Sequence, residues 1–438
     1  HGVPRARRQA TFRFEGVRLM SGFRVRTARE EDVEQLVEMG LCAYPDSGGF
    51  EVRRRNLMQN SFGNLNDVRV IEKDGRIAGQ AALYSIELWL GGRRVPSAAV
   101  ASVSVAPGER REGISRALLE QLHAEVDAQK AALTLLYPFR EGFYARLGYA
   151  TTAPLVTIRV ATGAFAHAPF LADAALGFAF RTLEGPLVAE ARLLYEEVAA
   201  TQAGRMVRTE ARWLRLFSRE ARHWMAAVGT SGRVEGYVSF SYDVPVSHGR
   251  QTLVVHELTA RDGRARRALL FALGKQRDQV DDVELTAAHG DPLLFAFYDA
   301  PGSRRGIAAI EHPLGTLGAG PMVRLADAAR ALTLRGYPVD GELDIVVSET
   351  SATSKTLHLV VRNGAGQASS DGERPAGADR AGKRPVIELL LSTLGSIVAA
   401  GLQPSDAAEL GLLRGQVTAV AMADSLFAGP RFQCLDPF

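Results

Sequence analysis

The chain has 438 residues, 46% of them hydrophobic and 23% charged, which is typical of a soluble globular protein with two or three domains. No apolar run approaches the roughly 18 residues that cross a bilayer, and two cysteines, Cys42 and Cys434, are too few for a disulfide scaffold or a multi-cysteine metal site. A formal charge of +3, from 52 basic and 49 acidic residues, is too balanced for a protein whose main partner is nucleic acid.

Residues 1–22 are expected to be an extension or a tag. They contain Arg5, Arg7 and Arg8 but no apolar core, so they lack the pattern of a secretory signal peptide. Met20 is a candidate natural start. We therefore expect a cytoplasmic protein.

The first predicted domain, residues 23–152, alternates helix and strand patterns. Apolar residues at helical spacing between Asp32 and Gly40 predict a helix, with acidic residues at its start, where the helix dipole favours them. Runs of β-branched residues that end at glycine or proline predict strands. The further elements expected are strands at 68–71, 77–90, 98–105 and 132–137, and a helix at 114–126.

The second predicted domain, residues 153–318, repeats this order of elements. The sequence Arg-Ala-Leu-Leu occurs at 116–119 and again at 267–270, each time in the helix after a strand and an arginine-rich loop. The second loop lacks a counterpart of Gly113, so we interpret this domain as a degenerate copy of the first. Its expected elements are helices at 185–200 and 210–219 and strands at 224–228, 234–242 and 252–258.

The third predicted domain, residues 319–438, has its own helices and strands. Helices are expected at 326–334, 386–400 and 404–413, and strands at 341–347 and 356–361. The polar stretch 364–384 predicts a mobile loop, because it offers little apolar surface to bury. The apolar tail, which contains Phe427, Phe432, Leu435 and Phe438, is expected to be tucked into the protein.

The most informative stretch is 103–116, where a strand leads into a glycine-containing loop that opens a helix. Free backbone N–H groups at a helix start bind phosphate, and Arg110 and Arg111 add the charge that a pyrophosphate requires. Gly113 lets a phosphate approach the backbone without a Cβ in the way. A basic loop before an ordinary helix is the alternative, and this stretch alone does not separate the two.

A second motif, Phe143-Tyr144-Ala145-Arg146-Leu147-Gly148-Tyr149, follows the next predicted strand. The order of strand, Arg-x-x-Gly-x-Ser helix start, strand and Phe-Tyr-x-x-Leu-Gly-Tyr resembles the acetyl-CoA site of the GNAT N-acetyltransferase superfamily. Ser115 stands where that superfamily prefers glycine or alanine. Residues 23–438 as a whole resemble its enhanced intracellular survival (Eis) branch. This resemblance implies an α+β fold with mixed sheets: an active GNAT domain, a GNAT domain without the cofactor loop, and a sterol-carrier-like domain.

The resemblance also implies roles for particular residues. The hydroxyl of Tyr144 would give a proton to the leaving coenzyme A, and the terminal carboxylate on Phe438 would act as base. Without the resemblance, a core tyrosine packed beside Phe143 is the simpler interpretation of Tyr144. The residues implied to bind acetyl-CoA are Val103, Ser104, Val105, Arg110, Arg111, Gly113, Ile114, Ser115, Arg116, Phe139 and Arg140.

Ordinary pKa values limit what the terminal carboxylate can do. A carboxylate near pKa 3.5 and an ammonium near 10 differ by about 6.5 units, so full deprotonation would cost roughly 9 kcal/mol. We therefore expect the carboxylate of Phe438 to orient an amine that is already poised to lose its proton. Transfer from a tyrosine near pKa 10 to a thiolate near 8.5 is uphill by only about 2 kcal/mol.

Other polar residues have weaker signals. Glu109 and Glu112 are expected to face solvent on the phosphate loop rather than to act as bases, and His123 is expected to be exposed. His256 and Glu257 alternate on a strand, which favours one buried and one exposed side chain. No cluster of histidine, cysteine and aspartate has metal-ligand spacing, so no metal is expected.

The resemblance implies an amine substrate, with aminoglycosides and protein lysines both open. A polycationic amine needs acidic groups at the pocket mouth, for which Asp46 and Asp436 are candidates, although either can equally be a turn aspartate. Hexamers are implied by the resemblance alone. The alternative function is a lipid- or sterol-binding protein on an inactive GNAT frame.

Overall fold

The computed structural model describes residues 17–18, 22–46, 48–166, 169–219, 221–243, 251–295, 315–350, 353–370 and 384–438. It divides into two compact units. The first unit comprises residues 1–86, 96–136 and 438, and the second unit comprises residues 87–95 and 137–437. Among the helices of the described residues, none is long and apolar enough to cross a membrane.

The first unit is built on a mixed sheet with strands in sequence order. The strands are β1 (Val17–Arg18), β2 (Arg24–Thr27), β3 (Val68–Lys73), β4 (Arg76–Leu90), β5 (Arg93–Val105) and β6 (Leu133–Leu136). The pairs β1–β2, β2–β3 and β3–β4 are antiparallel, whereas β6 is parallel to β5. The predicted extension therefore contributes one short strand, since Val17 and Arg18 pair with β2. Residues 1–16 and 19–21 lie outside the described residues.

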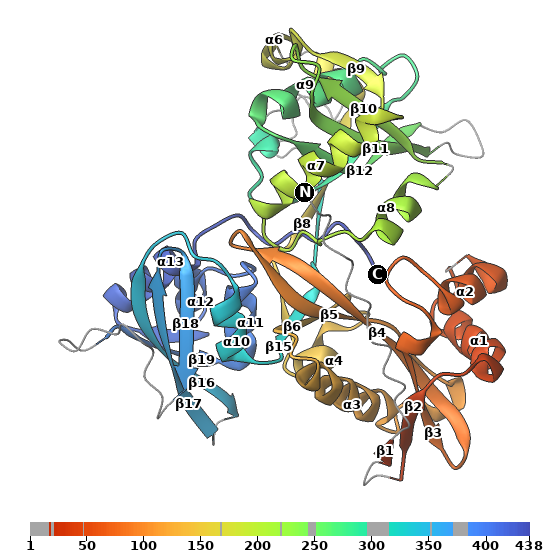
Figure 1. Cartoon of the computed structure of the whole chain (residues 1–438), viewed down its shortest axis with the longest axis vertical. Coiled ribbons are helices and arrows are strands. Elements are labelled where there is room, and N and C mark those ends of the chain that lie inside the picture. The colour runs from red at the N-terminus through yellow and green to blue at the C-terminus, as the bar shows by residue number, and fades with distance from the viewer. Residues whose placement is uncertain are drawn as a thin grey trace, which may run out of the picture. The chain divides into compact units, whose positions relative to one another are not determined.

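Helices of the first unit confirm the predicted periodicity and add one helix. Helix α1 (Val33–Ala43) and helix α3 (Ile114–Ala128) occur where apolar spacing predicts them. Helix α2 (Gly49–Met58), which lies beside α1 in Figure 1, was not predicted because it has no fully buried residue and so no clear apolar stripe. The expectation of an exposed His123 is wrong, since this residue is 7% exposed. It follows Leu119 by one helical turn and shares the buried face of α3.

The second unit contains a larger sheet in the order β14-β8-β13-β12-β11-β10-β9. Its faces carry two separate apolar clusters. Neighbouring strand residues alternate between them: Ala227 and Val238 belong to one cluster, Ala226 and Tyr237 to the other. The strands are β8 (Leu155–Ala161), β9 (Ala179–Thr182), β10 (His223–Val228), β11 (Val234–Asp243), β12 (Thr252–Ala260), β13 (Asp282–Ala288) and β14 (Gly315–Gly318).

Helices cover both faces of this sheet. Helix α9 (Gly263–Gly274), with α5 (Thr162–Ala166) and α6 (Pro169–Ala175), contributes to the cluster that contains Val238. Helices α7 (Pro186–Ala200) and α8 (Glu210–Phe217) contribute to the cluster that contains Tyr237. The predicted order of two helices, two strands, a strand and a helix in 185–274 is thus confirmed.

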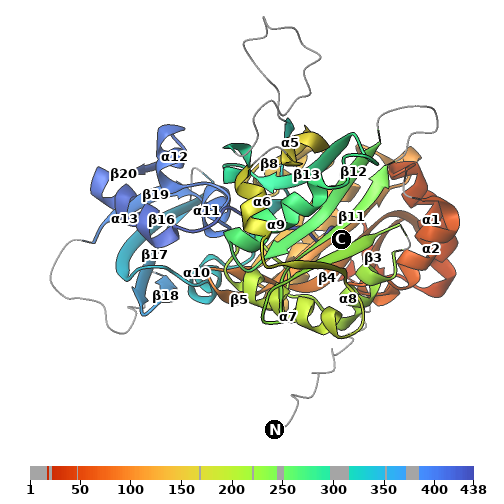
Figure 2. The same cartoon turned by 90° about the horizontal axis from the view of Figure 1, so that it is seen from above.

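The remainder of the second unit has a sheet in the order β18-β17-β16-β19-β20, with helices α11 and α13 packed against β16, as Figure 2 shows. The strands are β16 (Gly341–Thr350), β17 (Thr353–Arg362), β18 (Ala365–Ser370), β19 (Val386–Leu390) and β20 (Leu413–Gly415). The helices are α10 (Ala328–Leu334), α11 (Leu391–Val398), α12 (Pro404–Glu409) and α13 (Val417–Phe427). A short pair, β7 (Ala150–Thr151) and β15 (Met322–Leu325), also belongs to this unit.

Two predictions for this region are wrong in part. Residues 365–370 of the predicted loop form β18, which pairs with β17, while 371–383 lie outside the described residues. Residues 386–390 of the predicted helix form β19. There, Ile387 and Leu389 are buried while Val386, Glu388 and Leu390 are not, and this alternation of period two is the strand signal.

The tail is tucked in, as its apolar residues predict. Phe432, Cys434 and Asp436 are buried, and the backbone of Phe432 and Gln433 bonds to Ala400 and Ala203 respectively. Gly204 has φ +84°, and a Cβ there would come within 2.6 Å of the Phe432 ring. A glycine is therefore required where the tail passes.

Candidate functional site

Strand β5 has an open edge near its end. Its parallel register with β6 covers Ser97 to Ala99 and stops there, and Ser102 has a positive φ of 52°. A non-glycine residue with this backbone marks a local irregularity, which turns the strand out of its regular pleat. At this edge the carbonyl of Val103 accepts the hydroxyl of Tyr44 at 2.9 Å, and the buried Oγ of Ser104 has no hydrogen-bond partner among the described residues.

The loop after β5 has the backbone of an anion site. A 3-10 turn, Pro107–Glu109, leads to Gly113, which has φ 83° and caps α3 without a side-chain hydrogen bond. The first N–H groups of α3 therefore keep their donors free of a side-chain cap. Arg111 is held at φ 72°, a strained backbone for a side chain, and both Arg110 and Arg111 are exposed.

The charged side chains around this loop together carry a net positive charge. The ammonium of Lys73 pairs with Glu109 at 2.8 Å and also with Glu112, and these contacts raise the pKa of Lys73 well above its ordinary value. The single ammonium of Lys73 is thus shared by the two acidic side chains, and Arg110 and Arg111 add two further positive charges to the loop. Arg110 makes one contact, from Nη2 to the carbonyl of Cys42 at 3.3 Å. An anion at the start of α3 would meet arginines rather than carboxylates.

Tyr144 lies in the second unit, on α4 (Glu141–Ala145), and is 2% exposed. Its ring makes edge contacts with Phe139, Phe143 and Tyr149 at centroid distances of 5.5, 5.1 and 5.9 Å. Tyr144 thus packs beside Phe143, as the simpler interpretation of this tyrosine requires, and its catalytic role stays a prediction. Phe139 is 64% exposed, and Arg140 is the exposed N-cap of α4. Burial raises the pKa of Tyr149 far above its ordinary value, although Arg324 opposes the rise.

Phe438 belongs to the first unit and is half-buried. Its ring packs edge-on against Phe62 with 6.2 Å between centroids, and Phe62 in turn packs on Tyr84 at 6.0 Å. Asn60 donates to the hydroxyl of Tyr84 at 2.8 Å, which fixes that ring. The side chain of the last residue is therefore held in place by packing, and this positions the backbone carbon to which the terminal carboxylate is bonded.

The degenerate loop of the second unit differs from the first in one physical respect. Helix α9 starts at Gly263, and its N-cap Asp262 accepts the N–H of Ala265 at 2.8 Å. The carboxylate of Asp262 thus caps an N–H group at the start of α9, whereas Gly113, at the same position of α3, has no side chain to cap the first N–H groups. The nearby Arg266 is paired with Asp291 at 2.8 Å. This helix start therefore has a side-chain cap on one of the N–H donors that a phosphate would need, unlike the start of α3.

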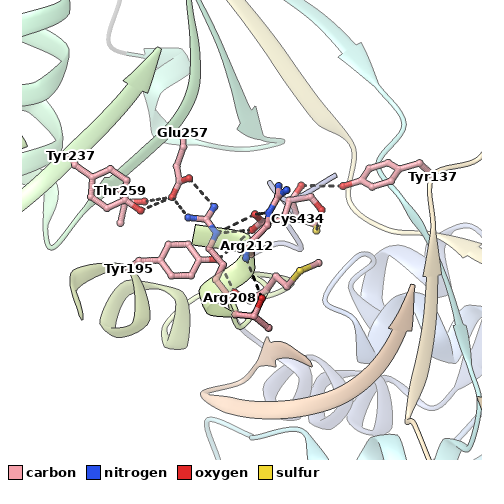
Figure 3. A network of polar contacts seen from close by, with 11 residues as sticks. Tyr137, Tyr195, Arg208, Arg212, Tyr237, Glu257, Thr259 and Cys434 are labelled. Atoms are coloured by element: carbon pink, nitrogen blue, oxygen red, sulfur yellow. Dashed lines mark hydrogen bonds and ion pairs between the residues drawn. The ribbon is translucent and has the colours of Figure 1, made fainter. Parts of the chain in front are cut away.

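A buried ion network holds the tail, and Figure 3 shows it from close by. Asp436 is 0% exposed and accepts Nε of Arg208 at 3.1 Å and Nε of Arg212 at 2.8 Å. Arg208 also forms a bidentate salt bridge with Glu257, with N–O distances of 3.1 and 2.7 Å. The hydroxyl of Tyr237 donates to Glu257 at 2.6 Å. Tyr137 donates to the carbonyl of Cys434 at 3.5 Å.

Burial alone would raise the pKa of both carboxyls, but the arginines outweigh it. The pKa of Asp436 is held below its usual range by Arg208 and Arg212, and that of Glu257 by Arg208. The expectation that Asp436 offers a carboxylate at a pocket mouth is wrong, because this group is buried and committed to two arginines. Asp46, by contrast, is exposed. Glu257 is buried and His256 half-buried; burial, with Arg222 and Arg219, lowers the pKa of His256 to about 4.

Sequence reasoning missed Arg208 and Arg212. One signal was available for Arg212: it lies beside Trp213 on α8 and one turn from Leu216, on the face that the spacing predicts to be buried. A buried arginine is stabilised by a buried acid, and here the tail supplies Asp436. Among the residues that the structure describes, no group of three or more histidines, cysteines, aspartates or glutamates could hold a metal ion.

Comparison with known families assigns three regions. Residues 24–152 match an acetyltransferase (GNAT) domain family, and residues 204–325 match a second acetyltransferase (GNAT) domain family. Residues 328–435 match the sterol carrier protein domain family. The regions occur in the order that the sequence predicts.

Among curated relatives, the N-acetyltransferase Eis of Mycobacterium tuberculosis (strain ATCC 25177 / H37Ra) is 32% identical over 114 residues. That match spans 25% of this chain and 28% of the relative. The same identity and coverage hold for Eis of Mycobacterium bovis (strain BCG / Pasteur 1173P2).

Two solved structures share the fold over nearly the whole chain. A GCN5-related N-acetyltransferase from Anabaena variabilis has a TM-score of 0.77 at 21% identity and covers 95% of this chain and 100% of its own. Eis1 from Mycobacterium abscessus has a TM-score of 0.71 at 22% identity, with 94% and 100% covered. At these identities the likeness is one of fold.

Proposed function

We propose that this chain, which has regions matching two GNAT acetyltransferase domain families and the sterol carrier protein domain family and is similar to Eis N-acetyltransferases over a quarter of its length, transfers the acetyl group of acetyl-CoA to an amine. The observation that carries this proposal is the start of α3. Gly113 leaves the helix donors uncapped beside two exposed arginines, whereas Asp262 caps the equivalent helix of the second copy.

Acetyl-CoA fits the residues at this site. Arg110 and Arg111, with the N–H groups from Gly113 to Arg116, would hold the pyrophosphate. The open edge of β5 at Val103, Ser104 and Val105 offers backbone groups and the unpartnered Ser104 hydroxyl to an amide-bearing arm. Bound there, acetyl-CoA supplies a thioester carbon: the amine nitrogen forms the new C–N bond, the C–S bond breaks, the amine loses one proton and the sulfur gains one.

Tyr144 is the group that we propose as proton donor to the sulfur. Its ring is fixed by three aromatic neighbours, so its hydroxyl is held in one direction. Moving the proton from the tyrosine hydroxyl to the thiolate costs about 2 kcal/mol at the pKa values found in water, which is within the range that positioned general acids overcome. Phe139, exposed at the same aromatic cluster, offers apolar surface to the bound co-substrate.

The terminal carboxylate is proposed to orient the acceptor amine. Packing of the Phe438 ring on Phe62 fixes its attachment point. Appending one glycine after Phe438 moves the carboxylate by about 3.5 Å, and turnover with saturating acetyl-CoA is expected to fall at least tenfold. Phe438→Tyr, which keeps both the aromatic ring and the terminal carboxylate, is the matched control. Unchanged turnover in the extended chain, measured by thiol release, contradicts this role.

The acceptor is proposed to be a polycationic primary amine such as an aminoglycoside, with protein lysines as the other amine class. Asp46, exposed in the first unit, is the remaining candidate to attract it. We also propose a cytoplasmic homo-oligomer, a hexamer by its resemblance to the Eis branch.

Binding of acetyl-CoA is expected to stabilise the protein by about 2.7 kcal/mol at one hundred times its dissociation constant. Arg110→Gln should weaken this binding about tenfold, because one charged contact to phosphate is lost. Arg54→Gln, an exposed arginine on α2, should leave it unchanged. Thermal unfolding with acetyl-CoA, a fatty acid or a sterol measures the effect. Stabilisation by the lipids alone would favour a carrier function, for which the sterol carrier protein match at 328–435 is the supporting observation.

A further inference from the structure

A cavity of about 280 Å³ lies in the second unit, at the place where β12 and β13 separate. The parallel register of these strands ends at Val255 and Leu285, and residues 256–260 and 286–287 line the cavity beyond that point. The start of α9, at Asp262 and Gly263, forms another part of its wall. The volume is at the lower end of the range for small-molecule sites.

The wall of this cavity contains both apolar side chains and arginines. Leu258, Leu270, Leu285, Ala287 and Leu293 supply the apolar part, and the tail contributes Leu435. Arg205 and Gln433 are among its polar residues. A ligand that matches this wall has a short apolar body and an acceptor group at one end.

Arg205 is the feature that points to a ligand. Its side chain is buried, with the residue 7% exposed, and its Nε and Nη1 atoms have no hydrogen-bond partner among the described residues. Buried N–H donors of a guanidinium are costly when they are left unsatisfied. The neighbouring arginines differ in this respect, since Arg208 and Arg266 are each paired with carboxylates.

The carboxylates on the cavity wall are already committed. Glu257 accepts from Arg208, Tyr237 and Thr259, so its charge is balanced within the network. Asp262 caps α9, and Asp291 pairs with Arg266. Among the described residues no carboxylate pairs directly with Arg205, which acts on Glu257 only through its charge, so a direct acceptor for its free N–H groups is left to a ligand.

We propose that this cavity of the second GNAT domain binds a small organic monocarboxylate through Arg205, with its short apolar chain against the leucines. Guanidinium groups match a planar carboxylate with two parallel hydrogen bonds. Coenzyme A is a poor candidate, because the Asp262 carboxylate occupies the start of α9 where a pyrophosphate would bind. This site does not depend on the activity proposed for the first GNAT domain.

Calorimetric titration of the full chain with sodium butanoate tests the proposal. We expect saturable binding at millimolar concentration, with butylamine, butanol and inorganic phosphate binding at least tenfold more weakly. Arg205→Met should weaken butanoate binding at least tenfold. Arg267→Gln removes the same charge from an exposed position on α9, outside the cavity wall, and should leave binding unchanged.

Two further measurements separate a binding role from a structural one. Without ligand, Arg205→Met should unfold at the same temperature as the natural chain or at a higher one, because an unsatisfied buried cation is removed. Ala287→Leu, which fills part of the cavity, should abolish butanoate binding while Arg205 is retained. Each of four results would overturn the proposal. Two concern the natural chain: no binding of butanoate, or binding of phosphate as tight as that of butanoate. Two concern Arg205→Met: butanoate binding that survives the substitution, or an unfolding temperature below that of the natural chain.

Discussion

Replacing Tyr144 with phenylalanine is expected to lower kcat for acetyl transfer by about 10²–10⁴-fold, the usual contribution of a positioned general acid. The substitution removes one oxygen and leaves the ring among Phe139, Phe143 and Tyr149, so packing is kept. The KM for acetyl-CoA should change little, since the substitution keeps the ring of Tyr144 packed on Phe139 and leaves the proposed pyrophosphate contacts at the start of α3 untouched. Steady-state thiol release measures both constants.

Tyr149→Phe is the matched control for this prediction. It removes a hydroxyl from the same aromatic cluster, at a tyrosine that is 1% exposed and has no proposed part in the chemistry. Turnover should stay within a fewfold of the natural chain. Equal losses in both variants, or no loss in Tyr144→Phe, would assign Tyr144 to the core rather than to catalysis.

The second large effect is expected at the ion network that holds the tail. Arg208→Met leaves the carboxylates of Glu257 and Asp436 buried with fewer partners, and removing one member of such a network typically costs about 3–5 kcal/mol of unfolding free energy. The side chains of all three residues are at most 3% exposed, so water cannot replace the lost contacts. Urea unfolding at neutral pH measures the loss.

Arg192→Met is the matched control, because Arg192 also lies over the Trp213 ring but pairs with Glu210 at an exposed site. Its cost should be at most about 1 kcal/mol. A similar cost for the two variants would show that the buried network contributes no more than a surface pair.

The network also predicts how stability depends on pH. Asp436 and Glu257 have lowered pKa values in the folded chain, so their contribution is present above the unfolded pKa values, near 4, and is lost as pH falls through the folded ones. In Arg208→Met, burial should dominate and raise both pKa values. The difference in stability between the two proteins should therefore narrow as the pH falls through the raised pKa values of the variant, and narrow further as it falls below about 4 through the lowered pKa values of the natural chain.

Local patterns predicted most of the elements. The stripe in α3, the β-branched runs of β4 and β5, and the repeated order of elements in 185–274 are local signals, and the structure contains each of these elements. The errors arose where local signals were weak or mixed. In 386–400 a strand of five residues runs directly into a helix, and an apolar segment of this length gives no boundary between them.

The candidate site also has parts that local sequence patterns predict and parts that only the fold brings together. The loop around Gly113 could be recognised because phosphate binding needs a particular local backbone, and the structure has an uncapped helix start there. The partners of Asp436 could not be predicted, because Arg208 and Arg212 are more than 220 residues away in the chain and are joined to it by the fold alone. His123 was misplaced because a polar residue at the border of a helical stripe can lie on either face.

The most direct test of the central claim is thiol release from acetyl-CoA with a panel of amines: an aminoglycoside, a polyamine and a lysine peptide. We expect release that depends on the amine, is highest with the aminoglycoside, and is lost in Tyr144→Phe. The acetyltransferase function would be contradicted if acetyl-CoA neither bound nor released thiol with any of these amines while a fatty acid or sterol bound tightly. That result would identify the chain as a carrier.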